Sequence, residues 1–144
     1  MSRSTEILLL KEQLRALSEF RHSLRRFLRF SEDAARDAGI TVLQYQVLLH
    51  IAGYPGREWA AIGELAELLQ AKPNGVVALV SRCEELGLVQ RKPGRQDRRQ
   101  VEVHMLAKGR KHLNRLAFQH QEHLLMLADA IEAARSETPG AEPR

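Results

Sequence analysis

Two long stretches of helical periodicity, one at each end of this 144-residue chain, set the limits on its architecture. Residues 5–38 repeat leucine at intervals of three, four and seven, which predicts a long amphipathic helix. Residues 107–135 predict a second one, whose face is marked by Leu113, Leu116, Leu124, Leu127 and Ile131. A helix of about thirty residues is ~45 Å long, whereas a compact chain of this length has a radius of gyration of only ~15 Å. Both helices would overhang a compact monomer and still carry apolar stripes, so we expect a homodimer.

The predicted dimer interface consists of apolar side chains on the two terminal helices: Leu10, Leu14, Leu17, Leu116, Leu124, Leu127 and Ile131.

The middle of the chain predicts three shorter helices. Residues 42–52 carry one apolar face, and Thr41 can cap this helix. Residues 62–69 form the next, and the turn QAKPN leads into a third, in which Pro73 suits the first helical position. This third helix would end at Gly87.

The third helix would bury one face and expose the other. The side chains expected on its inner face are Val76, Leu79, Val80, Cys83 and Leu86. Its outer face combines small side chains with polar ones, and such a face can lie close to base edges in a DNA major groove. The DNA-contacting residues expected from the turn and this face are Lys72, Asn74, Gly75, Val77, Ala78, Ser81 and Arg82.

A β-hairpin with a cationic tip follows, in the stretch RKPGRQDRRQVEVHML. Residues 88–92 and 100–106 predict two strands joined by a turn. The tip can bring Arg95, Arg98 or Arg99 to a minor groove, where narrow A·T tracts concentrate negative potential. Asp97 would repel phosphate, so we expect it to pair with an arginine and hold the shape of the tip.

The order of these pieces resembles the MarR family of bacterial transcription regulators, over roughly residues 20–116. The stretches GITVLQYQVLLHIA, IGELAELLQAKPNGVVALVSRCEELGLVQR and DRRQVEVHMLAKGRKHL carry the resemblance. Asp97 and Arg99 match the Asp-x-Arg motif that shapes the wing in that family. Met105 and Leu106 stand where the family usually has Leu-Thr, so the hydroxyl that would cap the last helix is lost.

The resemblance implies a mainly α fold, a winged helix-turn-helix with a two-stranded wing and long N- and C-terminal dimerisation helices. Within a single structural domain, residues 1–38 would form the N-terminal dimerisation helix and residues 39–106 the DNA-binding lobe. Residues 107–135 would form the C-terminal dimerisation helix, and residues 136–144 a disordered tail.

The resemblance also implies a function, that of a homodimeric DNA-binding regulator, usually a repressor. Two recognition helices about one turn of DNA apart, ~34 Å, would require a near-palindromic operator. Small aromatic acids or phenols often bind family members between the dimer helices and the lobe. Phe27, Tyr45 and Trp59 could line such a pocket here, with ordinary core filling as the alternative. No cofactor is expected.

Other functions stay open at this point. A winged-helix module that binds protein would use the same outer face. A metal-sensing or redox-sensing regulator would use His112, His120 and His123 on the last helix, or the single cysteine, Cys83. An arginine cluster on the first helix could lie near the DNA backbone or only solvate the helix: Arg25, Arg26 and Arg29.

Composition and missing motifs narrow the function classes further. The chain is 44% hydrophobic and 28% charged with a net charge of +4, which suits a globular protein with a polyanionic partner. Neither a run of ~18 apolar residues nor a signal-peptide core occurs, so we expect a cytoplasmic protein. The phosphate-binding loops and catalytic motifs of common enzymes are absent from the sequence, which argues against an enzyme.

Overall fold

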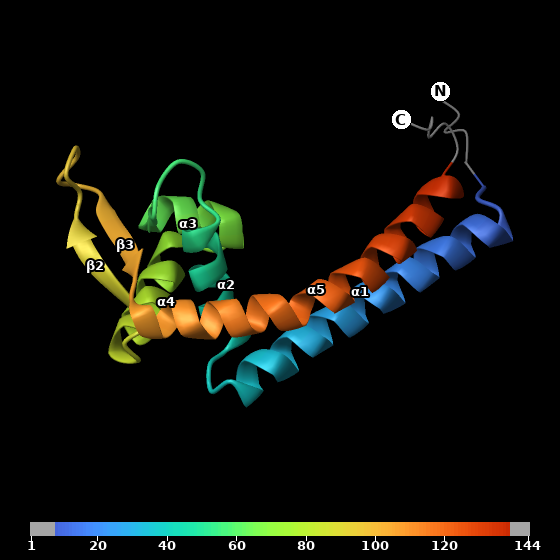
Figure 1. Ribbon diagram of the computed structural model, residues 1–144. Helices are drawn as coiled ribbons and strands as arrows, with labels where there is room; N and C mark the ends of the chain where they lie inside the picture. Colours follow the sequence, from blue (N-terminus) through green and yellow to red (C-terminus); the bar gives the residue numbers. More distant parts are fainter. Residues whose placement is uncertain (1–7, 139–144) are drawn as a thin grey trace, which may run out of the picture. The chain divides into compact units, whose positions relative to one another are not determined.

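The computed structural model describes residues 8–138 (Figure 1). These residues form five helices and three strands, α1 (Lys11–Asp37), α2 (Val42–Ala52), β1 (Trp59–Ala61), α3 (Ile62–Leu69), α4 (Pro73–Glu85), β2 (Val89–Pro93), β3 (Val101–Met105) and α5 (Ala107–Ser136). They divide into two compact units. We call residues 31–119 the lobe, and residues 8–30 together with 120–138 the stalk.

The first helix of the lobe begins where the sequence predicts. The Thr41 hydroxyl accepts the Gln44 N–H at 3.1 Å, and the Gln44 side-chain oxygen accepts the Thr41 N–H at 2.9 Å. This reciprocal capping box satisfies two amides that the first turn of a helix leaves without partners. It fixes the start of α2, whose Val47, Leu48 and Ile51 are fully buried in the core of the lobe.

The helix-turn-helix also follows the prediction, with one correction. Pro73 is the first residue of α4, and Val76, Val80 and Cys83 are fully buried. Leu86, predicted on the inner face, is 40% exposed instead, because it is the C-cap residue and lies beyond the last helical turn. Gly87 follows with φ +72°, as expected of a residue that ends a helix in the left-handed region.

A three-stranded antiparallel sheet in the order β1-β3-β2 completes the lobe. The hairpin of β2 and β3 is the predicted wing. The sequence predicted only the two strands of the wing, but residues 59–61 form a third strand, β1, which pairs with β3 from Trp59–His104 to Ala61–Glu102. A three-residue strand is too short to give an alternating pattern. β3 is therefore the central strand, and both of its edges are hydrogen-bonded.

The stalk consists of parts of α1 and α5 that run side by side (Figure 1). Phe30 of α1 stacks on His123 of α5 at 3.5 Å between ring centroids and contacts His120 edge-on at 5.2 Å. The helix predicted from residue 5 begins later in the described chain, at Lys11, where the Gln13 side chain accepts the Leu10 N–H at 2.8 Å. Residues 5–7 of that prediction lie outside the described residues.

The end of α5 also differs from the prediction. α5 includes Ser136, and the Thr138 N–H donates to the carbonyl of Arg135 at 3.0 Å, so the predicted disordered tail starts too early. Residues 139–144 of that tail lie outside the described residues. Among the helices that the structure describes, none has the length and apolarity needed to cross a membrane.

Candidate nucleic-acid interface

The outer face of α4 presents the side chains that the sequence predicted for DNA contact. Ser81 is half-buried, and the other six predicted positions are exposed, namely Lys72, Asn74, Gly75, Val77, Ala78 and Arg82. Val77 is 42% exposed, although Val76 beside it is fully buried. A Cβ added at Gly75 would meet nothing within 4 Å, so this part of the surface is open. The helical period thus separates a buried apolar face from a shallow exposed one.

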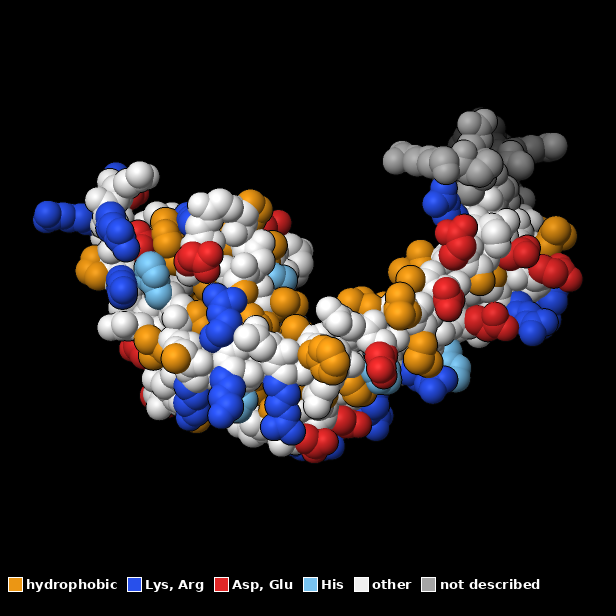
Figure 2. Space-filling view, viewed as in Figure 1, with side chains coloured by type: hydrophobic (Ala, Val, Ile, Leu, Met, Phe, Trp, Pro, Cys, Tyr) orange, Lys and Arg blue, Asp and Glu red, His pale blue; other side chains and the backbone are white. Residues whose placement is uncertain are grey.

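The wing tip is a compact loop held by backbone hydrogen bonds. The Gly94 N–H donates to the Gln100 carbonyl at 2.8 Å, and the Gln100 N–H donates to the Asp97 carbonyl at 3.0 Å. A Cβ at Gly94 would lie 2.1 Å from the Asp97 oxygen, so only glycine fits there. Figure 2 shows Lys and Arg side chains gathered around this end of the lobe.

Asp97 contacts Arg99, as the Asp-x-Arg motif implies. The Asp97 carboxylate accepts the Arg99 backbone N–H at 3.0 Å and lies 3.6 Å from its Nε. The Arg99 side chain is still 96% exposed, so the pair orients the loop and adds little stability. Arg98 has no hydrogen bond or ion pair with any other residue that the structure describes. Its charge, like most of Arg99, faces solvent.

A groove of about 540 Å³ joins the wing to the helix-turn-helix. One side is lined by residues of the wing, including Asp97, Arg99 and Val101, and the other by the start of α3 and by Val77 of α4. The structure therefore brings the wing and the outer face of α4 to the edges of the same hollow. Such a groove can accept a chain of phosphates at one edge while α4 faces the bases.

Sequence reasoning missed two carboxylates that hold the wing. Glu84 at the end of α4 accepts the backbone N–H of Arg91 at 2.8 Å, so Arg91 belongs to the base of the wing and not to its tip. Glu102 is only 3% exposed, and its carboxylate accepts the Arg95 N–H at 3.2 Å and lies 2.9 Å from Nε2 of His104. The hydrogen bond with His104, opposed by burial, lowers the pKa of Glu102, and the Arg95 amide adds to this effect.

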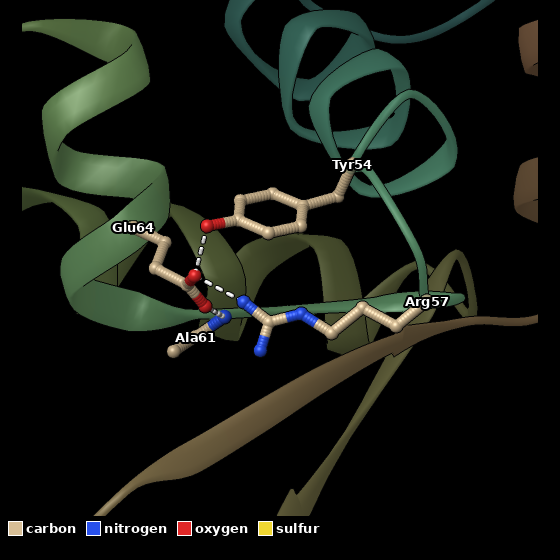
Figure 3. A network of polar contacts seen from close by, with 4 residues as sticks. All are labelled: Tyr54, Arg57, Ala61 and Glu64. Carbon is tan, nitrogen blue, oxygen red and sulfur yellow. Dashed lines mark hydrogen bonds and ion pairs between the residues drawn. The ribbon is translucent and has the colours of Figure 1, made fainter.

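A polar network ties the loop before β1 to the start of α3 (Figure 3). The Glu64 carboxylate accepts hydrogen bonds from the Tyr54 hydroxyl and the Arg57 guanidinium, and from the Ala61 N–H at 2.9 Å. The Arg57 guanidinium also lies 3.8 Å from the ring centroid of Trp59 and 4.3 Å from that of Tyr54. These contacts fix the entry to the helix-turn-helix. The residues of this network lie on a loop, a strand and a helix, so no periodic pattern in the sequence could predict their contacts.

The three aromatic residues predicted for a ligand pocket lie in different surroundings. Tyr45 is buried in the lobe, where burial raises the pKa of its hydroxyl. Trp59 packs against Arg57. Phe27 belongs to the stalk, and its ring contacts His120 edge-on at 5.9 Å. The pocket remains a prediction.

Two of the histidines considered for a sensor, and the cysteine, pack against other parts of the fold. His120 and His123 contact the phenylalanine rings of α1, and the described residues contain no group of three or more His, Cys, Asp and Glu that could hold a metal ion. Cys83 is fully buried, and burial raises the pKa of its thiol to about 11, which disfavours the reactive thiolate.

Leu116 corrects the predicted dimer interface. Its side chain is fully buried within the single chain, in the lobe, so it has no surface to offer a second copy. Helical periodicity identifies a buried stripe but cannot tell burial within the chain from burial against a partner.

Comparison with known proteins identifies this architecture. The model of the MarR family matches residues 38–100, and no curated protein sequence matches the chain. AbsC, a MarR family transcriptional regulator from Streptomyces coelicolor, is 19% identical, with 93% of this chain and 95% of that chain covered and a TM-score of 0.73. YusO from Bacillus subtilis is 20% identical, with 90% and 99% covered and a TM-score of 0.63.

A third solved structure is a mutant of MepR from S. aureus bound to an oligodeoxyribonucleotide. It is 19% identical, with 76% of this chain and 79% of that chain covered and a TM-score of 0.62. At these identities the structural likeness shows the fold, and the family model places the lobe. The fold of the chain is thus that of the winged helix-turn-helix proteins of the MarR family, and its residues 38–100 are similar to the model of that family.

Proposed function

We propose that this protein is a homodimeric, sequence-specific repressor whose lobe binds a near-palindromic operator. The observation that carries the proposal is the shared groove, which has the exposed Arg99 of the wing tip at one edge and Val77 on the outer face of α4 at the other. In this arrangement α4 would enter a major groove, and Arg95, Arg98 and Arg99 would reach the neighbouring minor groove or its phosphates. The MepR mutant, which is similar in fold, is bound to an oligodeoxyribonucleotide, and this likeness supports DNA binding by the present chain.

Exposed apolar side chains on the stalk support the proposed dimer. They include five of the predicted interface positions, since Leu10, Leu14, Leu17, Leu124 and Ile131 are all between 47% and 67% exposed. Figure 2 shows such side chains along the parts of the helices that form the stalk. Large exposed apolar patches are rare on monomers, and a second copy of the same stripe would cover this one.

The DNA-binding test compares two double variants by fluorescence anisotropy on DNA from upstream of the protein's own gene. Arg98→Ala with Arg99→Ala removes two wing charges, and Arg15→Ala with Arg21→Ala removes two charges from α1. Each phosphate contact contributes ~0.9 to the slope of log affinity against log salt. We expect the wing variant to lose affinity and up to about two units of slope per protomer, while the α1 control keeps both.

Three results would contradict this proposal. Equal losses in the two double variants would mean that net charge, and not the wing, governs binding. Equal affinity for operator and scrambled DNA would remove sequence specificity. Light scattering that gives the mass of one chain at the concentrations of the binding assay would remove the dimer.

The sign of regulation and the effector have their own tests. A reporter gene placed behind the bound DNA should be expressed less when the protein is present, and higher expression would make it an activator. We also propose that a small aromatic acid or phenol weakens operator binding, on the strength of the family resemblance. Benzoate and phenol should lower the anisotropy of the DNA complex, and a response no larger than with acetate would count against an aromatic effector.

A further inference from the structure

We propose that Glu102 positions the wing tip for DNA by holding the backbone of Arg95. Glu102 does not itself face DNA, because it is only 3% exposed. One carboxylate oxygen accepts the Arg95 N–H at 3.2 Å, and the other lies 2.9 Å from Nε2 of His104. The inference rests on the proposed DNA-binding function and adds a residue to it.

A carboxylate at this position requires a physical reason. Burying a charged group is costly unless hydrogen bonds or opposite charges compensate. Glu102 has these compensating partners, since the Arg95 N–H donates to it, the His104 ring lies within hydrogen-bond distance, and Lys92 is its partner residue on β2. The alternating pattern of β3 asks only for a polar side chain at this position. Glu102 differs from such a residue because it is buried and its carboxylate makes two hydrogen bonds.

Glu102 lies at the end of the three-stranded part of the sheet. Pairing between β1 and β3 ends at the pair Ala61–Glu102, whereas pairing between β2 and β3 continues one residue further, to Pro93–Val101. Beyond Glu102 the wing is therefore a two-stranded ribbon, which twists more freely than a three-stranded sheet. The Glu102 side chain reaches from the last three-stranded position into this freer part.

The tip thus has a carboxylate on each side of its loop. Asp97 accepts the N–H of Arg99 at 3.0 Å, and Glu102 accepts the N–H of Arg95. Each hydrogen bond fixes the backbone from which an exposed guanidinium extends. With both carboxylates in place, the two arginines leave the loop from defined positions, which lowers the ordering cost of meeting DNA.

Amide exchange measured by NMR tests the hold on Arg95 without DNA. We expect Glu102→Ala to speed exchange of the Arg95 amide by about tenfold or more, in line with the loss of a hydrogen bond to a charged group. The Gly94 amide, bonded to the Gln100 carbonyl, should change far less. Glu102→Gln keeps an acceptor oxygen and should retain most of the protection.

The matched control is Glu84→Ala, because Glu84 also accepts the backbone N–H of an arginine in the same hairpin. This variant should release the Arg91 amide and leave the Arg95 amide protected. On DNA, Glu102→Ala should reduce affinity and lower the salt slope by about one per protomer, and Glu102→Gln should restore both.

Several outcomes would overturn the inference. One is an Arg95 amide in the unaltered protein that exchanges as fast as in an unfolded chain, which can be measured even if Glu102→Ala does not fold. Another is an unchanged Arg95 amide in Glu102→Ala, and a third is faster exchange there with no change in DNA affinity. If the unaltered protein binds no DNA while the Arg95 amide behaves as expected, the proposed function fails and the hold of Glu102 on the loop stands.

Discussion

Gly109→Ala offers a quantitative test of how closely the first turn of α5 packs against the rest of the lobe. Gly109 is the third residue of α5 and is buried. A Cβ at this position would lie 2.3 Å from the carbonyl oxygen of Leu88 and 3.0 Å from Cδ2 of Leu48. The Leu88 oxygen cannot easily move away, because it belongs to the backbone at the start of the wing and accepts the Leu106 N–H at 2.9 Å.

The expected cost follows from this geometry. Ordinary contacts of a Cβ lie at 3.4–4 Å, so the carbonyl or the helix must shift by more than 1 Å. Overpacking of this kind costs about 1–3 kcal/mol, whereas replacing glycine by alanine in a helix gains about 1 kcal/mol. We expect Gly109→Ala to lower the free energy of unfolding by up to about 2 kcal/mol, the difference of these two effects.

Gly75→Ala is the matched control. Gly75 is also the third residue of its helix, α4, and a Cβ there meets nothing within 4 Å. The Gly75→Ala variant should show only the increase in the free energy of unfolding that alanine gives in a helix. The difference in the free energy of unfolding between the two variants then isolates the steric cost at Gly109, about 1–3 kcal/mol. Urea unfolding at one fixed protein concentration measures both, because the stability of the proposed dimer would depend on concentration. Equal stability of the two variants would refute the reasoning.

Three further predictions concern the lobe. Because burial raises the pKa of Cys83 to about 11, the native protein at about pH 8 should react with a thiol reagent far more slowly than the urea-unfolded protein, and similar rates would contradict this. Thr41→Ala removes the capping box of α2 and should cost about 1 kcal/mol in urea unfolding, whereas no change would mean that the cap is not formed. Burial alone would raise the pKa of the Glu64 carboxyl, but hydrogen bonds from Tyr54, Ala61 and Arg57 lower it. The stabilisation that Glu64 contributes is therefore present above the ordinary carboxyl pKa and is lost as pH falls through the lowered pKa. Glu64→Gln should therefore be less stable than the unaltered protein at neutral pH, with the gap closing in acid, and a gap that widens in acid would refute the assignment.

Local signals explain which parts of the fold were predictable. Thr41, Pro73 and Gly87 act within one turn of a helix, and each has the role in the structure that its chemistry predicts. The alternating faces of α4 follow from the helical period alone. These features need no knowledge of distant residues, so the short helices and the wing could be placed from the sequence.

Contacts between distant residues explain what was not predictable. β1 exists because residues 59–61 meet an open edge of β3, some forty residues later in the chain. Glu102 occupies an ordinary polar position of an alternating strand, and only the folded loop covers it. The space at Gly109 is filled by the carbonyl of Leu88, a contact that no pattern within α5 reports. For the predicted DNA-binding residues, the helical period forecasts exposure, but their contacts with DNA stay a prediction.

The aromatic contacts of Phe30 with His120 and His123 have a consequence for how two copies would assemble. They join the first and last helices inside one chain, so each protomer can order its own stalk before it meets another. Assembly would then dock two preformed surfaces and would not require either chain to fold upon the other. We therefore expect folding and association to be separable steps, with an ordered single chain between them, unlike in obligate dimers that have no stable folded monomer.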